Sequence, residues 1–197
     1  MCQMKSGIIL KDRVFVPDYD SHTDMLQELG IADTRQNAER LFVRAELLPP
    51  DDDVFAPIEK WKFTVDQDIL PDWYVENFDK DRMVSAVKEW AKDRIHIGVN
   101  SLRILQGSNH YIKDCENVEI CDNATVEYIY GNATVKNICD NATVDGVRGQ
   151  AVIIVSSCGW KNKETMVITE NATFKDCETK TIYQSGDWKL IKVGKKE

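Results

Sequence analysis

The densest group of side chains that could bind a metal lies near the start of the chain. Asp18, Asp20, His22 and Asp24 place three carboxylates and one imidazole within seven residues. Carboxylate oxygens suit hard cations, and an imidazole adds affinity for transition metals. A metal held there could activate water. A small metal-dependent hydrolase is therefore the enzymatic alternative for this chain.

The same residues also have a structural interpretation. They precede and enter an expected short helix, in which Asp20 or Ser21 is the N-cap and Met25, Leu26 and Leu29 form the apolar stripe. Acidic side chains at a helix start are stabilised by its unpaired N–H groups and by the macrodipole. The spacing matches no known metal-binding loop. We therefore favour a capped helix and expect no cofactor.

Two further pairs of residues could do chemistry. His110 and Cys115 could act as a base and a nucleophile, but nothing supplies an orienting third group or an oxyanion site. Cys121 and Cys139 could hold a soft metal, yet two thiols without a CxxC motif or a neighbouring histidine are more typical of small buried hydrophobes. We therefore predict structural roles for both pairs.

A short repeat positions these residues in the second half of the chain. The phrase NATV occurs at Asn123, Asn132 and Asn141, and its variant QAVI at Gln150, so the spacing is nine residues. The preceding residue alternates between Asp and Gly, at Asp122, Gly131, Asp140 and Gly149. The full period is therefore 18 residues, which predicts a β-solenoid with one coil per period. A left-handed β-helix acyltransferase would instead require a hexapeptide period.

The repeat also predicts a register. Val126, Val135 and Val144 should point inward and the threonine before each should point outward, because side chains alternate along a strand. Asn123 should stack under Asn141, and Cys121 under Cys139. We expect the solenoid to start at Tyr111 and to be interrupted at residues 158–168. A C-terminal β-hairpin that turns at Ser185-Gly186 should cap its open strand edges.

The first hundred residues show no repeat and mix strand and helix patterns. Strands are expected within residues 7–16, on both sides of a turn at residues 11–12, and over 41–48 and 60–66. A helix is expected over 80–94, with a stripe of Met83, Val87, Trp90 and Ala91. The fold prediction is an acidic α+β domain over residues 1–100, followed by an all-β solenoid with its cap over 101–197.

The formal net charge of −8 lies mainly in the first half. Residues 1–100 carry 20 acidic and 13 basic side chains, whereas residues 101–197 carry 13 and 12. Direct nucleic-acid binding is therefore disfavoured, and a protein with a basic surface is the expected partner, although a merely solvated acidic face is an alternative. The expected binding residues are Asp51, Asp52, Asp53, Asp72, Trp73, Tyr74 and Glu76. Trp73 and Tyr74 could instead belong to the core, where most aromatics of residues 61–90, Phe78 included, are expected.

The cellular location follows from two absences in the sequence. No apolar run is long enough to span a bilayer, and the start MCQMKSGIIL lacks the pattern of a signal peptide. We expect a cytoplasmic protein that does not bind membranes, whose six cysteines are reduced thiols. Its N-A-T triplets are then repeat residues and not glycosylation sites. The sequence does not indicate an oligomeric state.

Several phrases carry a resemblance to a known family. LKDRVFVPDYDSHTDMLQELGI, FVRAELLPP, KWKFTVDQDILPDWYVE and YIKDC are similar to an uncharacterised family of proteins from gut Clostridia and their phages, with a similar N-terminal domain and a repeat tail. The resemblance implies a phage or mobile-element accessory factor. We accordingly expect a non-enzymatic binding protein that acts stoichiometrically on a host protein. An inhibitor of a nucleic-acid-handling host enzyme, such as a CRISPR effector, is its concrete form.

Overall fold

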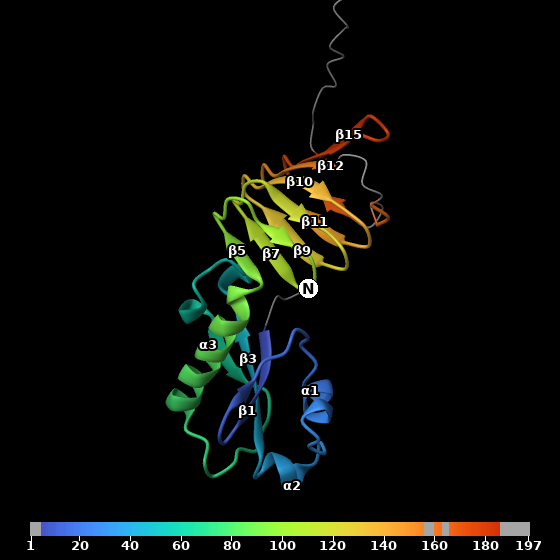
Figure 1. Cartoon of the computed structure of the whole chain (residues 1–197). Helices are drawn as coiled ribbons and strands as arrows, with labels where there is room; N and C mark the ends of the chain where they lie inside the picture. Colours follow the sequence, from blue (N-terminus) through green and yellow to red (C-terminus); the bar gives the residue numbers. More distant parts are fainter. Residues whose placement is uncertain (1–4, 156–159, 163–165, 186–197) are drawn as a thin grey trace, which may run out of the picture. The chain divides into compact units, whose positions relative to one another are not determined.

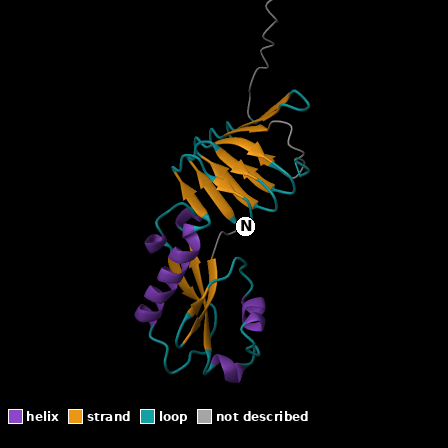
Figure 2. Cartoon of the chain, viewed as in Figure 1, coloured by secondary structure: helices purple, strands orange, loops and turns teal. Residues whose placement is uncertain are grey.

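The chain forms two compact units, residues 1–95 and 96–197. The computed structural model describes residues 5–155, 160–162 and 166–185 (Figure 1). All helices of the described residues belong to the first unit, and the second is built from strands and turns (Figure 2). No helix in the described ranges is long and apolar enough to cross a membrane.

The first unit is organised around a four-stranded antiparallel sheet. The strands are β1 (Lys5–Leu10), β2 (Val14–Phe15), β3 (Phe42–Leu48) and β4 (Lys62–Val65), in the order β2-β1-β3-β4. β1 and β2 form the expected hairpin, in which the Leu10 N–H donates to the Arg13 carbonyl at 2.7 Å. β2 is therefore one edge of this sheet.

Helices cover both faces of the sheet (Figure 1). α3 (Glu76–Lys92) packs on one face, and α1 (His22–Glu28) and α2 (Arg35–Ala38) lie at the other. Gly7 packs closely under α3, because an added Cβ would lie 2.9 Å from Met83 Cε and 3.1 Å from the Phe15 carbonyl oxygen. Ile8 and Phe42 join Met25, Leu26 and Ala38 in the core beneath α1 and α2. The two faces of β3 therefore pack against different helices.

Two helix boundaries follow from local capping. Ser21 is the N-cap of α1, and its Oγ accepts the Asp24 N–H at 3.3 Å. α3 starts four residues earlier than expected, because the Asp79 carboxylate accepts the N–H of the N-cap residue Val75 at 2.8 Å. The short 3-10 helices η1 (Pro50–Asp52) and η2 (Ile58–Lys60) connect β3 to β4.

The second unit confirms the predicted β-solenoid, with two sheets wound from coils of about 18 residues, whose strands pair in parallel except for the last one, β15. One sheet contains β5 (Ile95–Ile97), β7 (His110–Lys113), β9 (Thr125–Tyr130), β11 (Thr143–Val147) and β13 (Val167–Ile168). The other contains β6 (Arg103–Ile104), β8 (Val118–Ile120), β10 (Thr134–Ile138), β12 (Val152–Val155), β14 (Thr173–Asp176) and β15 (Thr181–Gln184). Val144 pairs with Val126 one period below it. The solenoid starts before the expected Tyr111, because β5 and β6 already pair in it.

The interior and the corners of the coils follow the repeat. Val126, Val135 and Val144 are fully buried, as predicted. The alternating Asp and Gly positions all adopt a left-handed backbone, with φ of 54° at Asp122 and 69° at Gly131. Asn141 Nδ2 donates to Asn123 Oδ1 at 3.2 Å, so the predicted asparagine ladder is formed. Stacked corners thus satisfy polar groups at the solvent boundary.

The last coils depart from the regular repeat. Trp160, within the predicted interruption, is buried and donates its Nε1–H to the Ala142 carbonyl at 2.8 Å. β15 pairs antiparallel with β14 through a turn at residues 177–180, so a terminal hairpin forms. The turn expected at Ser185-Gly186 and the strand after it extend beyond the described residues.

Candidate binding surface of the first unit

Three of the four predicted metal-binding residues, Asp18, Asp20 and His22, have separate partners. Asp18 accepts two hydrogen bonds from Arg94, at 3.1 and 2.6 Å. Burial alone would raise the pKa of Asp18, but the hydrogen bonds and charge of Arg94 outweigh it and lower that pKa. Asp20 accepts from Lys5 Nζ at 2.8 Å and from the Ser6 N–H at 2.9 Å. Both carboxylates are therefore engaged in the fold.

Lys5 is an unusual partner because its side chain is buried. Only 1% of it is exposed, and its Nζ also donates to the Tyr19 carbonyl at 3.2 Å. Burial lowers the pKa of Lys5, and the adjacent Asp20 opposes that shift. The ammonium group also lies 4.9 Å from the ring centre of Trp90. Asp20 thus serves as the counterion of a buried cation.

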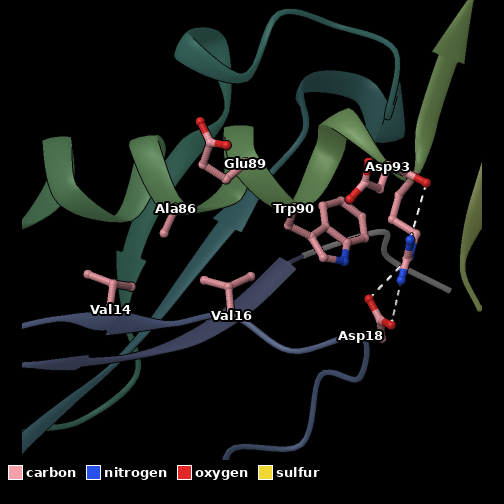
Figure 3. A pocket seen from close by; sticks show the side chains of 8 residues that line it. Val14, Val16, Asp18, Ala86, Glu89, Trp90 and Asp93 are labelled. Carbon is pink, nitrogen blue, oxygen red and sulfur yellow. Dashed lines mark hydrogen bonds and ion pairs between the residues drawn. The ribbon is translucent and has the colours of Figure 1, made fainter. Parts of the chain in front are cut away.

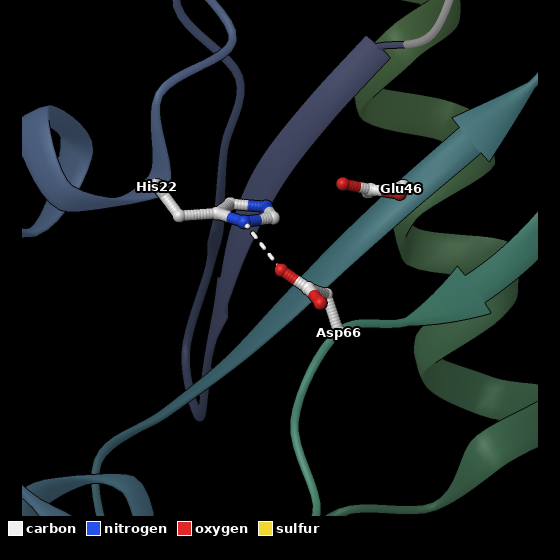
Figure 4. A group of neighbouring side chains, drawn as sticks. All are labelled: His22, Glu46 and Asp66. Carbon is white, nitrogen blue, oxygen red and sulfur yellow. Dashed lines mark ion pairs between the residues drawn. The ribbon is translucent and has the colours of Figure 1, made fainter.

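The other two members of the group point elsewhere. Asp24 is exposed in the first turn of α1. His22 lies beside Asp66 and Glu46, with 3.2 Å between His22 Nδ1 and Asp66 Oδ2 (Figure 4). The sequence cluster therefore does not assemble as one set of ligands, and His22 belongs to a group that sequence spacing does not reveal.

The predicted binding residues lie at opposite ends of β3. Asp51, Asp52 and Asp53 follow its last residue and are exposed. Near its first residue, Trp73 donates its Nε1–H to the Arg40 carbonyl at 2.8 Å. A strand of seven residues spans roughly 20 Å. The structure therefore separates the two sets into different surfaces.

The large apolar side chains just after Trp73 and Tyr74 are strongly exposed to solvent. These two aromatics are partly buried, and burial, with the charges of Glu76 and Asp79, raises the pKa of Tyr74. By contrast, Val75 is 58% exposed and Phe78 is 62% exposed. Contiguous exposed apolar patches mark interaction sites, so these two side chains, three residues apart in the sequence, are candidates for contact with a partner.

The sequence contained a signal for the exposure of Phe78. Counting back in steps of four from Ala91 through Val87 and Met83 leads to Asp79, which is 1% exposed. Phe78 is one residue off this buried stripe, and the expected helix start at residue 80 concealed that offset. The polar residue Asp79, at a buried position of the helix, thus indicates that α3 begins before residue 80.

A buried ion pair fixes the start of α3. Arg82 donates to Asp79 Oδ1 at 2.7 Å and to the Leu10 carbonyl at 2.9 Å. The Arg82 guanidinium also lies 5.6 Å from the ring centre of Phe78. Because Asp79 caps Val75 at the same time, the backbone that presents Phe78 is tied to the end of β1. The apolar side chains are therefore displayed from a rigid support.

Two hollows run beside α3 and the edge strand β2. The first, of about 460 Å³, includes Phe78, Asp81 and Val14 in its wall. The second, of about 420 Å³, is lined by Val14, Val16, Asp18, Ala86, Glu89, Trp90, Asp93 and Arg94 (Figure 3). The hollows share Val14 and Ala86 in their walls, so they are neighbours. Their walls combine apolar side chains with carboxylates and with Arg13, Arg82 and Arg94.

Three exposed carboxylates lie in the same segment of the chain as Val75 and Phe78. Asp72, Glu76 and Asp81 are exposed and form no ion pair with any other residue of the described ranges. Together with Val75 and Phe78 we call them the α3 surface. Its chemistry suits a partner that offers cationic groups beside an apolar side chain, since apolar anchors supply affinity and charge complementarity supplies orientation and rate.

The cysteine and histidine pairs of the solenoid have structural partners. Cys115 is buried, and its Sγ is 3.3 Å from the His96 carbonyl. His110 contacts the Gln106 carbonyl through Nε2 at 3.0 Å and His96 Nε2 through Nδ1 at 3.3 Å. Cys121 is buried, and neither it nor Cys139 is part of a disulfide. These contacts give His110 and Cys115 structural partners.

Comparison of the chain with protein-family models, with curated proteins and with solved structures finds no match.

Proposed function

We propose that this chain is a non-enzymatic binding protein that contacts a basic protein surface through its α3 surface. The observation that carries the proposal is the exposure of Val75 and Phe78, at 58% and 62%, in a segment that also carries three exposed carboxylates without ion pairs within the described structure. A basic partner would neutralise these carboxylates while its apolar side chain covers Phe78. The solenoid serves as a spacer or a second contact.

The first unit supports this proposal through its net charge. With 20 acidic and 13 basic side chains in residues 1–100, it attracts cationic surfaces and repels nucleic acid. An acidic protein surface can occupy a basic channel that otherwise holds nucleic acid. Inhibition of a nucleic-acid-handling host enzyme, a CRISPR effector included, is therefore the concrete form of the proposal.

The biological setting belongs to the same proposal. The resemblance to proteins of gut Clostridia and their phages supports a phage or mobile-element accessory factor that works in the host cytoplasm. Such a factor acts stoichiometrically, so its effect should saturate at a fixed ratio to its target. A catalytic factor would instead act at substoichiometric amounts.

The test is capture of partners by the immobilised full chain from a gut clostridial lysate, with identification by mass. The variant Asp72→Asn/Glu76→Gln/Asp81→Asn removes the three carboxylates of the α3 surface. We expect this variant to lose the captured protein. Phe78→Ala should weaken capture as well, because a central aromatic anchor is typically worth more than 1 kcal/mol.

A matched control removes the same number of charges elsewhere. In Asp51→Asn/Asp52→Asn/Asp53→Asn, asparagine tolerates the left-handed backbone at residues 51 and 52, where φ is 52° and 57°. This control should capture the partner normally. Equal loss in the two triple variants would show that capture depends on net charge alone, and capture by both would refute the α3 surface.

A further inference from the structure

We propose that His22, Glu46 and Asp66 form a binding site for a divalent transition-metal ion of the zinc class. The three residues come from three elements: the first residue of α1, the middle of β3 and the segment just after β4 (Figure 4). One ligand atom of each lies within 4.8 Å of the other two. The site is separate from the α3 surface, because it lies on the other face of the sheet.

The face of the sheet follows from strand register. Gly7 contacts α3, and it pairs with Ala45 in β3. Successive residues of a strand point to opposite faces, so Glu46 points away from α3 and toward the side of α1. Loss of a metal at this site would therefore leave the proposed protein-binding surface intact.

The imidazole of His22 is flanked by two hydrogen-bond acceptors. Its Nε2 lies 3.3 Å from the Ala45 carbonyl oxygen, and its Nδ1 lies 3.2 Å from Asp66 Oδ2. A neutral imidazole has only one N–H, so it can satisfy one of these acceptors. With Nε2–H donated to Ala45, the Nδ1 lone pair faces a carboxylate. A cation between Nδ1 and Asp66 removes this repulsion.

The arrangement is also that of a supported metal ligand. Histidines that bind metals commonly donate the second ring N–H to a backbone carbonyl, which fixes the tautomer and the ring plane. The Ala45 carbonyl occupies that place for His22. The imidazole side chain is only 11% exposed, so its orientation is restricted further by packing.

The nearby Arg and Lys side chains form ion pairs with other carboxylates. The Arg44 guanidinium, on the same face of β3, pairs with Asp33, and Lys5 pairs with Asp20. The Glu46 carboxylate makes no hydrogen bond or ion pair with another residue in the described ranges, and it is partly buried. The two carboxylates of the group are thus left without a balancing positive charge from Arg or Lys.

A second, independent observation concerns Ser6 on the neighbouring strand β1. Ser6 is the cross-strand partner of Glu46 and shares its face, because opposed residues of an antiparallel pair point the same way. Ser6 is fully buried, and its Oγ has no hydrogen-bond partner within the described structure. Such buried polar atoms are uncommon in proteins. A metal-bound water or a reoriented Glu46 would supply the missing partner.

The donor set indicates the class of metal. One imidazole nitrogen and two carboxylate oxygens suit zinc and its neighbours, whereas Mg²⁺ and Ca²⁺ prefer oxygen ligands alone. Tetrahedral zinc, with bonds near 2.0–2.1 Å, separates its ligand atoms by about 3.4 Å. The His22 to Asp66 distance already matches this value, and rotation of the Glu46 side chain brings in the third ligand. One coordination position remains for water.

The test is calorimetric titration of the full chain with ZnCl₂ at neutral pH. We expect one site that involves these residues, with affinity reduced roughly tenfold or more in each of His22→Ala, Glu46→Gln and Asp66→Asn. The Gln and Asn variants preserve side-chain size, and circular dichroism checks their folds. Co²⁺ bound at the site should show d–d absorption without thiolate charge transfer, which excludes binding by cysteines.

Asp24→Asn is the matched control, since it removes a carboxylate from α1 without touching the three ligands. It should bind Zn²⁺ like the unaltered chain. Absence of Zn²⁺ binding by the unaltered chain, or an affinity in all three ligand variants equal to that of the unaltered chain, would overturn the proposal. A thiolate band in the Co²⁺ spectrum would also overturn it.

Discussion

Val135→Asp tests the register of the solenoid, with Thr134→Lys as its neighbour control. Val135 is fully buried and pairs with Val118 and Ile153 of the adjacent coils. Thr134, one residue earlier, points outward and is partly exposed. The two substitutions therefore introduce a charge on opposite sides of the same strand.

The magnitude follows from burial. Loss of a fully buried valine side chain forfeits about 1.5–3 kcal/mol, and an unpaired buried polar group adds about 1–3 kcal/mol. We therefore expect Val135→Asp to lower the free energy of unfolding by about 3–5 kcal/mol. Thr134→Lys should change it by less than about 0.5 kcal/mol, as is usual for exposed positions.

Urea unfolding followed by far-UV circular dichroism measures both values. For a unit of about 100 residues, each 1 kcal/mol corresponds to a shift of about 4–8 °C in melting temperature, so thermal unfolding gives a second measurement. Comparable losses in the two variants would refute the inward direction of Val135. A larger loss for Thr134→Lys would require a register shifted by one residue.

Three other predictions concern single side chains. Gly131→Ala should destabilise the solenoid by about 1 kcal/mol or more in urea unfolding, because φ is 69° and an added Cβ would collide with the carboxylate of the coil below; an unchanged midpoint would contradict this. Asp20→Ala should cost about 2 kcal/mol, more than loss of a helix cap, because it leaves Lys5 buried without its counterion; a double variant that adds Lys5→Met should recover part of that loss in the same assay. The ion pair with Arg94 lowers the pKa of Asp18, so its contribution to folding stability is complete above the ordinary carboxyl pKa and is lost as pH falls toward the lowered value. Asp18→Asn should therefore flatten the acid side of the plot of stability against pH. An unchanged acid side would contradict the pairing.

The solenoid was predictable because its information is local and repeated. Each NATV copy predicts the same alternation of inward and outward side chains. The Asp or Gly before it occupies a corner of the coil and has a left-handed backbone conformation. The stacking of Asn141 on Asn123 follows directly from the 18-residue period. The burial of Trp160 did not follow, because it occurs once, outside the repeat.

The candidate sites of the first unit depend on contacts between distant segments. Asp18 and Arg94 are 76 residues apart, so the sequence could not show that this carboxylate already has a partner. The approach of His22 to Glu46 and Asp66 likewise requires the order of β3 and β4 in the sheet. Sequence spacing identified His22 as a candidate ligand but placed it with the wrong neighbours in space.

The most direct test of the proposed function is the association rate of the purified complex measured against ionic strength. The full chain and its Asp72→Asn/Glu76→Gln/Asp81→Asn variant would each be mixed with the captured partner at several salt concentrations. We expect fast association that slows steeply with salt for the unaltered chain, and slower association with a weaker salt dependence for the variant. Identical rates and identical salt dependence for the two proteins would contradict it.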